Sequence, residues 1–310
     1  MPPPSADRWT LQGRVVSYQA GQPVAGARVQ PQGGAAVTTD GNGRFTIGGD
    51  GPPPANPYLV TVDGGGHVAR SVHVRWQPGS RDDVTIDLIP LAAPFSLDFY
   101  RELARGGLNQ PQNLRPLQRL TEDPSFYIQT TDFRGVDVPA DTLRVVREAI
   151  PSAVHEFSGG TLRAARIEEG REARPEAPGW INVTLFYDTQ GLLCGRASIA
   201  TTPGFVELAY GNAVCSCNSP TGMSENLVRH ELGHVLGFSH VAGREHIMTT
   251  FQDAACAGRP EGGASALERY HAALVYHRPP GNTDPDRDPA QIALTGPAAG
   301  RSAAISCYFR

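Results

Sequence analysis

Residues 230–240 read His-Glu-Leu-Gly-His-Val-Leu-Gly-Phe-Ser-His, and this stretch decides what the second half of the chain can be. In an α-helix, residues four positions apart lie one turn apart on the same face. His230 and His234 can therefore direct both imidazoles at one metal ion. Glu231 stands beside the first histidine, where it can reach a water on that ion. The pattern predicts a metal-binding helix from about Met223 to Gly237.

Gly237 and His240 extend this pattern beyond the bare pair of histidines. Glycine can adopt the left-handed backbone conformation that ends a helix and turns the chain sharply. Such a turn would bring His240 back to the same ion. Three imidazoles and a water form the open tetrahedral site of catalytic zinc. We therefore expect His230, His234 and His240 to hold Zn²⁺, and Glu231 to move a proton from water to the leaving amine.

The string His-Glu-x-x-His-x-x-Gly-x-x-His resembles that of the metzincins, a clan of zinc endopeptidases. The resemblance implies a methionine turn below the metal, and Met248 stands eight residues after His240. This short spacing is similar to that of the matrixin branch. Val241 stands where matrixins often have Ser, and Thr249-Thr250 where they often have Tyr-Pro. The chain is therefore matrixin-like rather than a matrixin, over roughly residues 126–280.

The same resemblance implies how a substrate binds. By analogy with metzincins, the strand Phe205–Tyr210 is the edge strand that pairs with an extended peptide. The expected contacts of the substrate lie on this strand and on the wall after the methionine: Phe205, Glu207, Ala209, Thr249, Thr250 and Phe251.

Other interpretations of these residues remain open. The helix could be a metal-free core helix, or the zinc site could have lost catalysis. In gluzincins the third ligand is a glutamate on a later helix, and Glu268 on the helix predicted at 265–276 could take that role. We expect His155 to lie at the surface. We expect His246 to face solvent, with support of the metal ligands as the alternative.

Residues 8–90 read as β structure, because short alternating runs are separated by Gly, Pro, Asp and Asn without a helical period. They predict a small antiparallel sandwich. Three stretches in order resemble the carboxypeptidase regulatory-like (transthyretin-like) module: Gly13-Arg-Val15, residues 22–29 (Gln-Pro-Val-Ala-Gly-Ala-Arg-Val) and residues 39–45 (Thr-Asp-Gly-Asn-Gly-Arg-Phe). The resemblance implies an accessory domain, with surface attachment or substrate binding as alternatives.

The remaining organisation follows from composition and periodicity. Residues 91–125 are expected to be a linker with a short helix near Phe95–Leu103, and residues 281–310 a C-terminal tail. Residues 126–280 form the second domain. Its strands are expected at Phe126–Thr130, Leu162–Ile167, Trp180–Tyr187 and Phe205–Tyr210, and a helix follows Pro139. The fold class is thus an all-β sandwich followed by an α+β metzincin-like domain, with a mixed twisted sheet and an active-site helix.

The tail contains acidic residues at alternate positions, Asn282-Thr-Asp-Pro-Asp-Arg-Asp288. Calcium loops alternate acids in this way, but the glycine and the terminal glutamate of such a loop are missing. We expect a solvated tail, with structural Ca²⁺ as the alternative.

Composition excludes several classes of function. All 27 basic residues are Arg, so lysine chemistry such as a Schiff base is excluded. The formal net charge of −4 gives no electrostatic case for nucleic-acid binding. No apolar run approaches the ~20 residues of a membrane span.

Five cysteines, at 194, 215, 217, 256 and 307, all lie in the protease half. Cys215 and Cys217 are too close to pair with each other, and the other pairings stay open. No cysteine precedes Cys194, so the prodomain cysteine switch of matrixin zymogens cannot operate in this chain. Disulfides favour an oxidising compartment, so we expect a secreted protein whose signal peptide is absent from this sequence.

Together these observations favour a secreted zinc endopeptidase that acts as a monomer on extended peptides. The alternative is a binding or adhesion protein, in which the sandwich engages a surface or glycan and the zinc domain is an inactive scaffold.

Overall fold

The computed structural model describes residues 8–51, 56–75, 83–189, 193–249, 256 and 263–294. The chain divides into two compact units. The first comprises residues 1–93 together with 282–310, and the second comprises residues 94–281. The chain therefore leaves the first unit, builds the second, and returns to the first.

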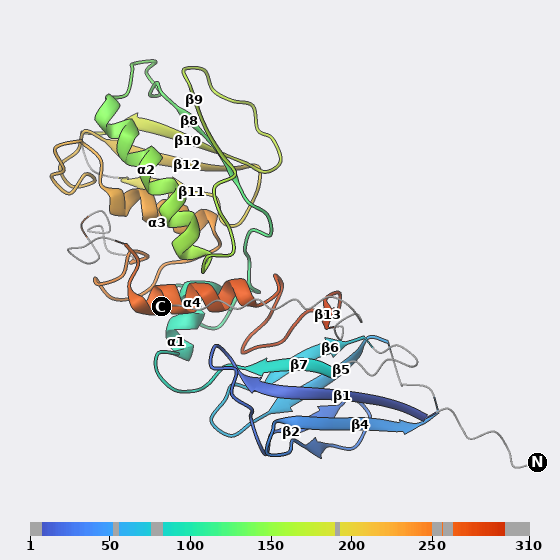
Figure 1. The fold of residues 1–310 in the computed structure, drawn as a ribbon. Coiled ribbons are helices and arrows are strands. Elements are labelled where there is room, and N and C mark those ends of the chain that lie inside the picture. Colours follow the sequence, from blue (N-terminus) through green and yellow to red (C-terminus); the bar gives the residue numbers. More distant parts are fainter. Residues whose placement is uncertain are drawn as a thin grey trace, which may run out of the picture. The chain divides into compact units, whose positions relative to one another are not determined.

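The first unit is a pair of β-sheets (Figure 1). One sheet has the strand order β4-β1-β7 and the other has the order β13-β6-β5-β2-β3. The strands are β1 (Arg8–Ser17), β2 (Arg28–Pro31), β3 (Val37–Thr38), β4 (Arg44–Asp50), β5 (Tyr58–Asp63), β6 (Arg70–Val74), β7 (Asp83–Leu88) and β13 (Ala293–Leu294). The predicted all-β sandwich is confirmed. It is not wholly antiparallel, because β7 runs parallel to β1 and β13 runs parallel to β6.

Alternating side chains build the core of this sandwich. On β5, Tyr58, Val60 and Val62 are buried, and the residues between them are only partly buried. Successive side chains of a strand point to opposite faces of its sheet, so this alternation places one face of the strand against the core. The rings of Trp9 and Tyr58 meet edge to face, with their centroids 5.5 Å apart.

The segment after Gly281 is not a solvated tail where the structure describes it. Asp286 and Asp288 are 1% and 4% exposed, and both face the buried guanidinium of Arg70 on β6. The Asp288 carboxylate lies 2.8 Å from Arg70 Nη2, and Asn282 Nδ2 donates to both aspartates, at 2.9 and 2.8 Å. Asp286 and Asp288 are thus counter-ions and hydrogen-bond acceptors of side chains in their own unit.

The second unit is a five-stranded sheet of order β11-β12-β10-β8-β9 with helices (Figure 1). The strands are β8 (Ser125–Gln129), β9 (Arg166–Gly170), β10 (Trp180–Tyr187), β11 (Gly195–Ala197) and β12 (Gly204–Tyr210). Strands β9, β8, β10 and β12 are neighbours in that order and run parallel. Strand β11 is antiparallel to β12. The expectation that Phe205–Tyr210 is an edge strand is therefore wrong. Within the described residues, β11 is the edge beside it.

Four helices accompany this sheet: α1 (Leu97–Arg105), α2 (Ala140–Phe157), α3 (Glu225–Val235) and α4 (Ala266–His277). Helix α2 packs against α3, and α3 packs on β11 and β12. Side chains at helical spacing on α2, including Val146, Ile150 and Val154, are fully buried. This apolar stripe is what predicted the helix from sequence.

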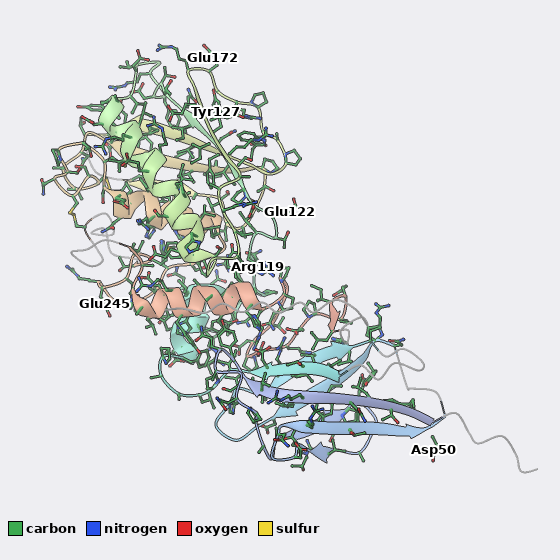
Figure 2. The ribbon with its side chains drawn as sticks, in the orientation of Figure 1. Asp50, Arg119, Glu122, Tyr127, Glu172 and Glu245 are labelled. Atoms are coloured by element: carbon green, nitrogen blue, oxygen red, sulfur yellow. A yellow bond between two sulfur atoms is a disulfide. The ribbon has the colours of Figure 1, made fainter. Side chains whose placement is uncertain are left out.

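Most of the segment expected to be a linker belongs to the second unit, which begins at Pro94. Tyr100 and Leu103 on α1 are fully buried. Further along lies Arg119, which is labelled in Figure 2. It donates from Nε to the Arg278 carbonyl oxygen at 2.9 Å and lies over the Tyr276 ring. The buried side chains of α1 and the contacts of Arg119 therefore fix a segment that composition alone predicted to be a linker.

The buried ion cluster of the first unit generates a stability prediction. Replacing Arg70 by Met leaves Asp286 and Asp288 buried without their cation, which costs about 3–5 kcal/mol. Hydrogen exchange of β5 and β6 amides in the full chain, measured against denaturant, should show this loss. The exposed Arg28 provides a control, since Arg28→Met should change stability by less than about 0.5 kcal/mol. Equal protection in both variants would contradict the prediction.

Candidate metal centre

Helix α3 presents two of the three candidate ligands. Ser224 caps its first turn, because its side chain accepts a hydrogen bond from the Leu227 amide. His230 and His234 then lie one turn apart, with their ring centroids 4.8 Å from each other. The helix spacing read from the sequence therefore places both imidazoles on one face.

Gly237 turns the chain back toward this face. Its φ of +109° lies in the region that favours glycine, and a Cβ here would stand 2.0 Å from the Gln118 carbonyl oxygen. After the turn, the Ser239 amide donates to the Leu103 carbonyl oxygen at 2.7 Å. These contacts return His240 to the other two histidines, as the sequence predicted.

The three imidazoles converge through their Nε2 atoms. Nε2 of His240 lies 3.1 Å from that of His230 and 3.2 Å from that of His234. Tetrahedral zinc with Zn–N bonds of about 2.1 Å separates its ligand nitrogens by roughly 3.4 Å. Among the described residues, these three histidines are the group that could hold a metal ion.

Backbone carbonyls orient two of these rings. His230 Nδ1 lies 2.7 Å from the Ile247 carbonyl oxygen, and His234 Nδ1 lies 2.8 Å from that of Phe238. A carbonyl only accepts, so Nδ1 of each ring carries the proton and the Nε2 lone pair remains for a cation. The surroundings thus select the tautomer that a metal ligand needs.

Burial keeps these imidazoles neutral. It lowers the pKa of His230 to about 4 and that of His234 to about 3, and it also lowers the pKa of His240. Removing a charged imidazolium from water is costly, so the neutral form dominates near pH 7. Neutral imidazole is the form that binds a metal.

Glu231 is a buried carboxyl group beside the histidines. It is 4% exposed, and its Oε2 has no hydrogen-bond partner among the described residues. Burial raises its pKa to about 8. An unpaired buried carboxyl is costly unless a ligand or cation compensates it. Its position therefore fits a site that receives a cation and a water.

Met248 packs beneath α3. A Cβ on Gly233 would stand 2.3 Å from the Met248 sulfur, so only glycine lets the methionine approach this closely. The Met248 amide donates to Glu268 Oε1 at 2.8 Å, and its carbonyl oxygen accepts from the Val241 amide at 2.8 Å. Hydrogen bonds of its backbone amide and carbonyl groups thus fix Met248 in place.

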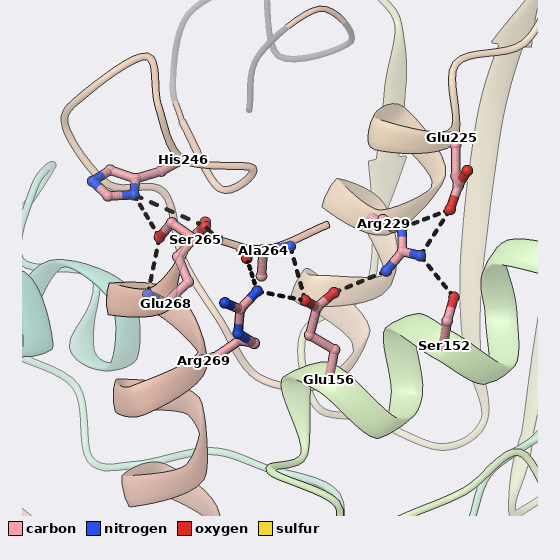
Figure 3. A network of polar contacts seen from close by, with 9 residues as sticks. All are labelled: Ser152, Glu156, Glu225, Arg229, His246, Ala264, Ser265, Glu268 and Arg269. Atoms are coloured by element: carbon pink, nitrogen blue, oxygen red, sulfur yellow. Dashed lines mark hydrogen bonds and ion pairs between the residues drawn. The ribbon is translucent and has the colours of Figure 1, made fainter. Parts of the chain in front are cut away.

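Glu268 is fully buried and does not join the histidines, so the structure does not support it as a third ligand. Its Oε2 accepts from the Ser265 amide at 2.7 Å, and the Ser265 hydroxyl caps α4 in return. His246 shares this cluster: its Nδ1 lies 2.9 Å from Ser265 Oγ (Figure 3). The expectation that His246 faces solvent is wrong, because its ring packs on Phe99 in the interior. His155 is exposed, as expected.

A second group of contacts joins the helices around the site (Figure 3). Glu156 on α2 accepts from Arg229 on α3 at 2.8 Å and from Arg269 on α4 at 3.3 Å. Arg229 directly precedes His230, so these ion pairs restrain the rotation of the helix that carries the ligands.

The histidines and Glu231 open into a cavity of about 440 Å³. One wall is strand β11, through Gly195, Arg196 and Ala197. Four residues between 106 and 115 also line the cavity, and so does Ser239. The lining residues are Gly106, Asn109, Gln110, Arg115, Gly195, Arg196, Ala197, Ile199, His230, Glu231, His234, Ser239 and His240.

The predicted substrate contacts that the structure describes do not line this cavity. Phe205 and Glu207 line a different cavity, of about 620 Å³, and Ala209 is fully buried. Thr249 is buried, and Thr250 and Phe251 lie outside the described residues. Strand β11 was missed because three residues are too few to show a period.

Two disulfides settle most of the pairing that the sequence left open. They join Cys194 to Cys215 and Cys217 to Cys256. Cys194 directly precedes β11, so the first bridge anchors the start of the strand that borders the cavity. Cys307 lies outside the described residues.

Residues 10–89 match the family model of the carboxypeptidase regulatory-like domain. The N-terminal module is a carboxypeptidase regulatory-like domain. This confirms the resemblance seen in the sequence for that part of the chain. No curated protein matches the chain.

Two solved structures illustrate weak similarity to this chain. The 5-hydroxyisourate hydrolase of Klebsiella pneumoniae is 20% identical over 26% of this chain and 91% of that protein, with a TM-score of 0.22. Metalloproteinase-II of Bacteroides fragilis is 11% identical over 87% of this chain and 91% of that protein, with a TM-score of 0.33. Function must therefore be argued from the residues of the site.

No described helix is long and apolar enough to cross a membrane.

The histidine geometry predicts one metal site. The full chain should bind about one equivalent of Zn²⁺, and His240→Ala should weaken binding by more than about 100-fold, since it removes a direct ligand. Isothermal titration with zinc measures this. The exposed His155 provides the control, and His155→Ala should keep the affinity. Unchanged affinity in His240→Ala would show that the zinc lies elsewhere.

The position of Glu268 predicts a structural effect. Glu268→Ala leaves the buried amides of Met248 and Ser265 without an acceptor, which costs about 1–3 kcal/mol for each amide. Denaturant unfolding of the zinc-free chain should show the loss. The exposed Glu176 is a matched control, because Glu176→Ala should stay within about 0.5 kcal/mol of wild type. A stable Glu268→Ala protein would refute this account of the methionine turn.

Proposed function

We propose that the second unit is a zinc-dependent endopeptidase with Glu231 as its general base and acid. The observation that carries the proposal is the meeting of three neutral imidazoles with a buried, unpaired carboxyl group in one open cavity. Structural zinc sites use four protein ligands, whereas catalytic sites use three and leave a position for water. Three histidines in a cavity fit the catalytic class.

Zinc held by His230, His234 and His240 would supply Lewis acidity, lowering the pKa of a water toward about 7 and polarising a carbonyl. The chain's own residues do the rest. Glu231 Oε2 has no competing partner, so it is free to accept a proton from water and to deliver it to the leaving amine. A nearby cation stabilises the carboxylate form and so opposes the effect of burial on the pKa of Glu231.

Strand β11 offers a place for an extended substrate. It is the edge of the described sheet, and all three of its residues line the cavity that holds the histidines. An edge strand has backbone amides and carbonyls that are not paired on one side, and an extended peptide can add to them as a further strand. The proposed substrate strand is therefore β11 rather than Phe205–Tyr210.

The disulfides bear on where this activity operates. Disulfides persist in oxidising compartments and are rare in the cytosol. With two of them in the catalytic unit, we place the protease outside the cytosol.

Replacing Glu231 tests the mechanism. Glu231→Ala should lower kcat/KM by roughly 10²–10⁴-fold or more, because general acid–base catalysis is lost, while zinc binding persists. Cleavage of a mixed peptide library followed by mass spectrometry measures activity, and isothermal titration measures zinc. Glu245, which is largely exposed, serves as the control through Glu245→Gln.

Two outcomes would overturn the proposal. Equal cleavage by wild type and Glu231→Ala would mean that another protein or residue cuts the peptides. Zinc-loaded wild type that cleaves no peptide would mean that the histidine centre is a scaffold.

A further inference from the structure

Residues 106–115 form a closed loop beside the metal centre. The Arg115 amide donates to the Arg105 carbonyl oxygen at 3.0 Å, and Arg105 Nη1 donates back to the Arg115 carbonyl oxygen at 3.4 Å. Arg105 itself is fully buried. The base of the loop is therefore fixed, and its members Asn109, Gln110 and Arg115 line the cavity with His234 and His240.

The guanidinium of Arg115 is held in one place. Its Nη2 donates to the hydroxyl of Ser239, the residue directly before the ligand His240. A Cβ on Gly106 would stand 3.0–3.4 Å from three atoms of the Arg115 guanidinium, so that group lies close over the glycine backbone. Arg115 lines the same cavity as His234 and His240. The cation therefore acts within the same site.

Arg115 stands out by its lack of a counter-ion. Arg196 also lines the cavity, but it pairs with Glu207. No carboxylate in the described part of the chain pairs with Arg115, and Glu231 is the only acidic residue among the described residues that line the cavity. A guanidinium carries five N–H donors, and here only one has a described acceptor. The other N–H groups of the Arg115 guanidinium match a carboxylate in geometry and in charge.

We propose that Arg115 binds a carboxylate of the substrate, so that the protease prefers peptides with a negative charge near the scissile bond. This rests on the proposed function, since it assigns the substrate class of the same cavity. The carboxylate can come from an Asp or Glu side chain or from the C-terminus of a short peptide. The chemistry at Arg115 is the same in both cases, and the test separates the two sources.

The test uses the zinc-loaded full chain and two series of fluorescein-labelled hexapeptides. One series places Glu or Gln at each position around a cleavable bond, and the other compares free with amidated C-termini. Wild type should cleave the best Glu peptide roughly 10- to 100-fold better in kcat/KM than its Gln partner, because a charged hydrogen bond is lost. If the C-terminus is the source, the free and amidated peptides should differ by this factor instead. The preference should weaken at high salt, where exposed charges are screened.

Arg115→Gln should bring this ratio close to one, and Arg115→Lys should keep part of it. The exposed Arg163 is a control for net charge, and Arg163→Gln should keep the wild-type ratio. A purely structural role of Arg115 would lower both members of a pair equally and leave the ratio unchanged. That result, or a wild type without any preference for a carboxylate, would overturn the inference.

Binding separates this inference from the proposed function. Fluorescence anisotropy with the same peptides, on wild type and Arg115→Gln, measures recognition without cleavage. If no peptide is cut but Glu peptides still bind better through Arg115, the endopeptidase proposal fails and the carboxylate site stands. If Glu and Gln peptides bind equally, or neither binds, the carboxylate site fails whatever the cleavage result.

Discussion

The close approach of the Gln118 carbonyl oxygen to residue 237 is the constraint on which the candidate metal centre depends. No side chain fits there, and the positive φ of Gly237 turns the chain directly after the helix. Without that turn, α3 would present two histidines and the third would lie elsewhere. The residue opposite the turn comes from the segment that composition marked as a linker. The geometry of the ligands is therefore supported from a distant part of the chain.

The environment that packs the site also sets its protonation states. The same burial disfavours imidazolium and carboxylate, so it lowers the pKa of the three histidines and raises the pKa of Glu231. A divalent cation would compensate for this burial, since it binds neutral imidazoles and stabilises a carboxylate. The hydrogen bonds of the His230 and His234 Nδ1 atoms to backbone carbonyls complete the arrangement. The site is thus organised for a cation by the fold itself.

Sequence patterns correctly predicted the features that depend on residues close together in the chain. The i, i+4 histidines, the glycine turn and the alternation of Trp180–Tyr187 needed only helix and strand periodicity. The misjudged features depend on partners far away in sequence. Asp288 looked solvated because its partner Arg70 lies 218 residues earlier, and His246 looked exposed because Ser265 and Phe99 are not its neighbours in sequence. Arg115 carries no motif, and only the cavity reveals that it lies beside the histidines.

The return of the chain to its first unit has a consequence for synthesis. Residues 94–281 separate the strands of the carboxypeptidase regulatory-like domain from the segment that supplies Asp286, Asp288 and β13. At about 5–20 residues per second on the ribosome, these 188 residues take roughly 10–40 s to make. Throughout that time Arg70 lacks two of its counter-ions and β6 lacks a neighbour. The unit whose strands are made first is therefore the last to be completed, and the nascent chain must carry an open sheet edge while the second unit folds.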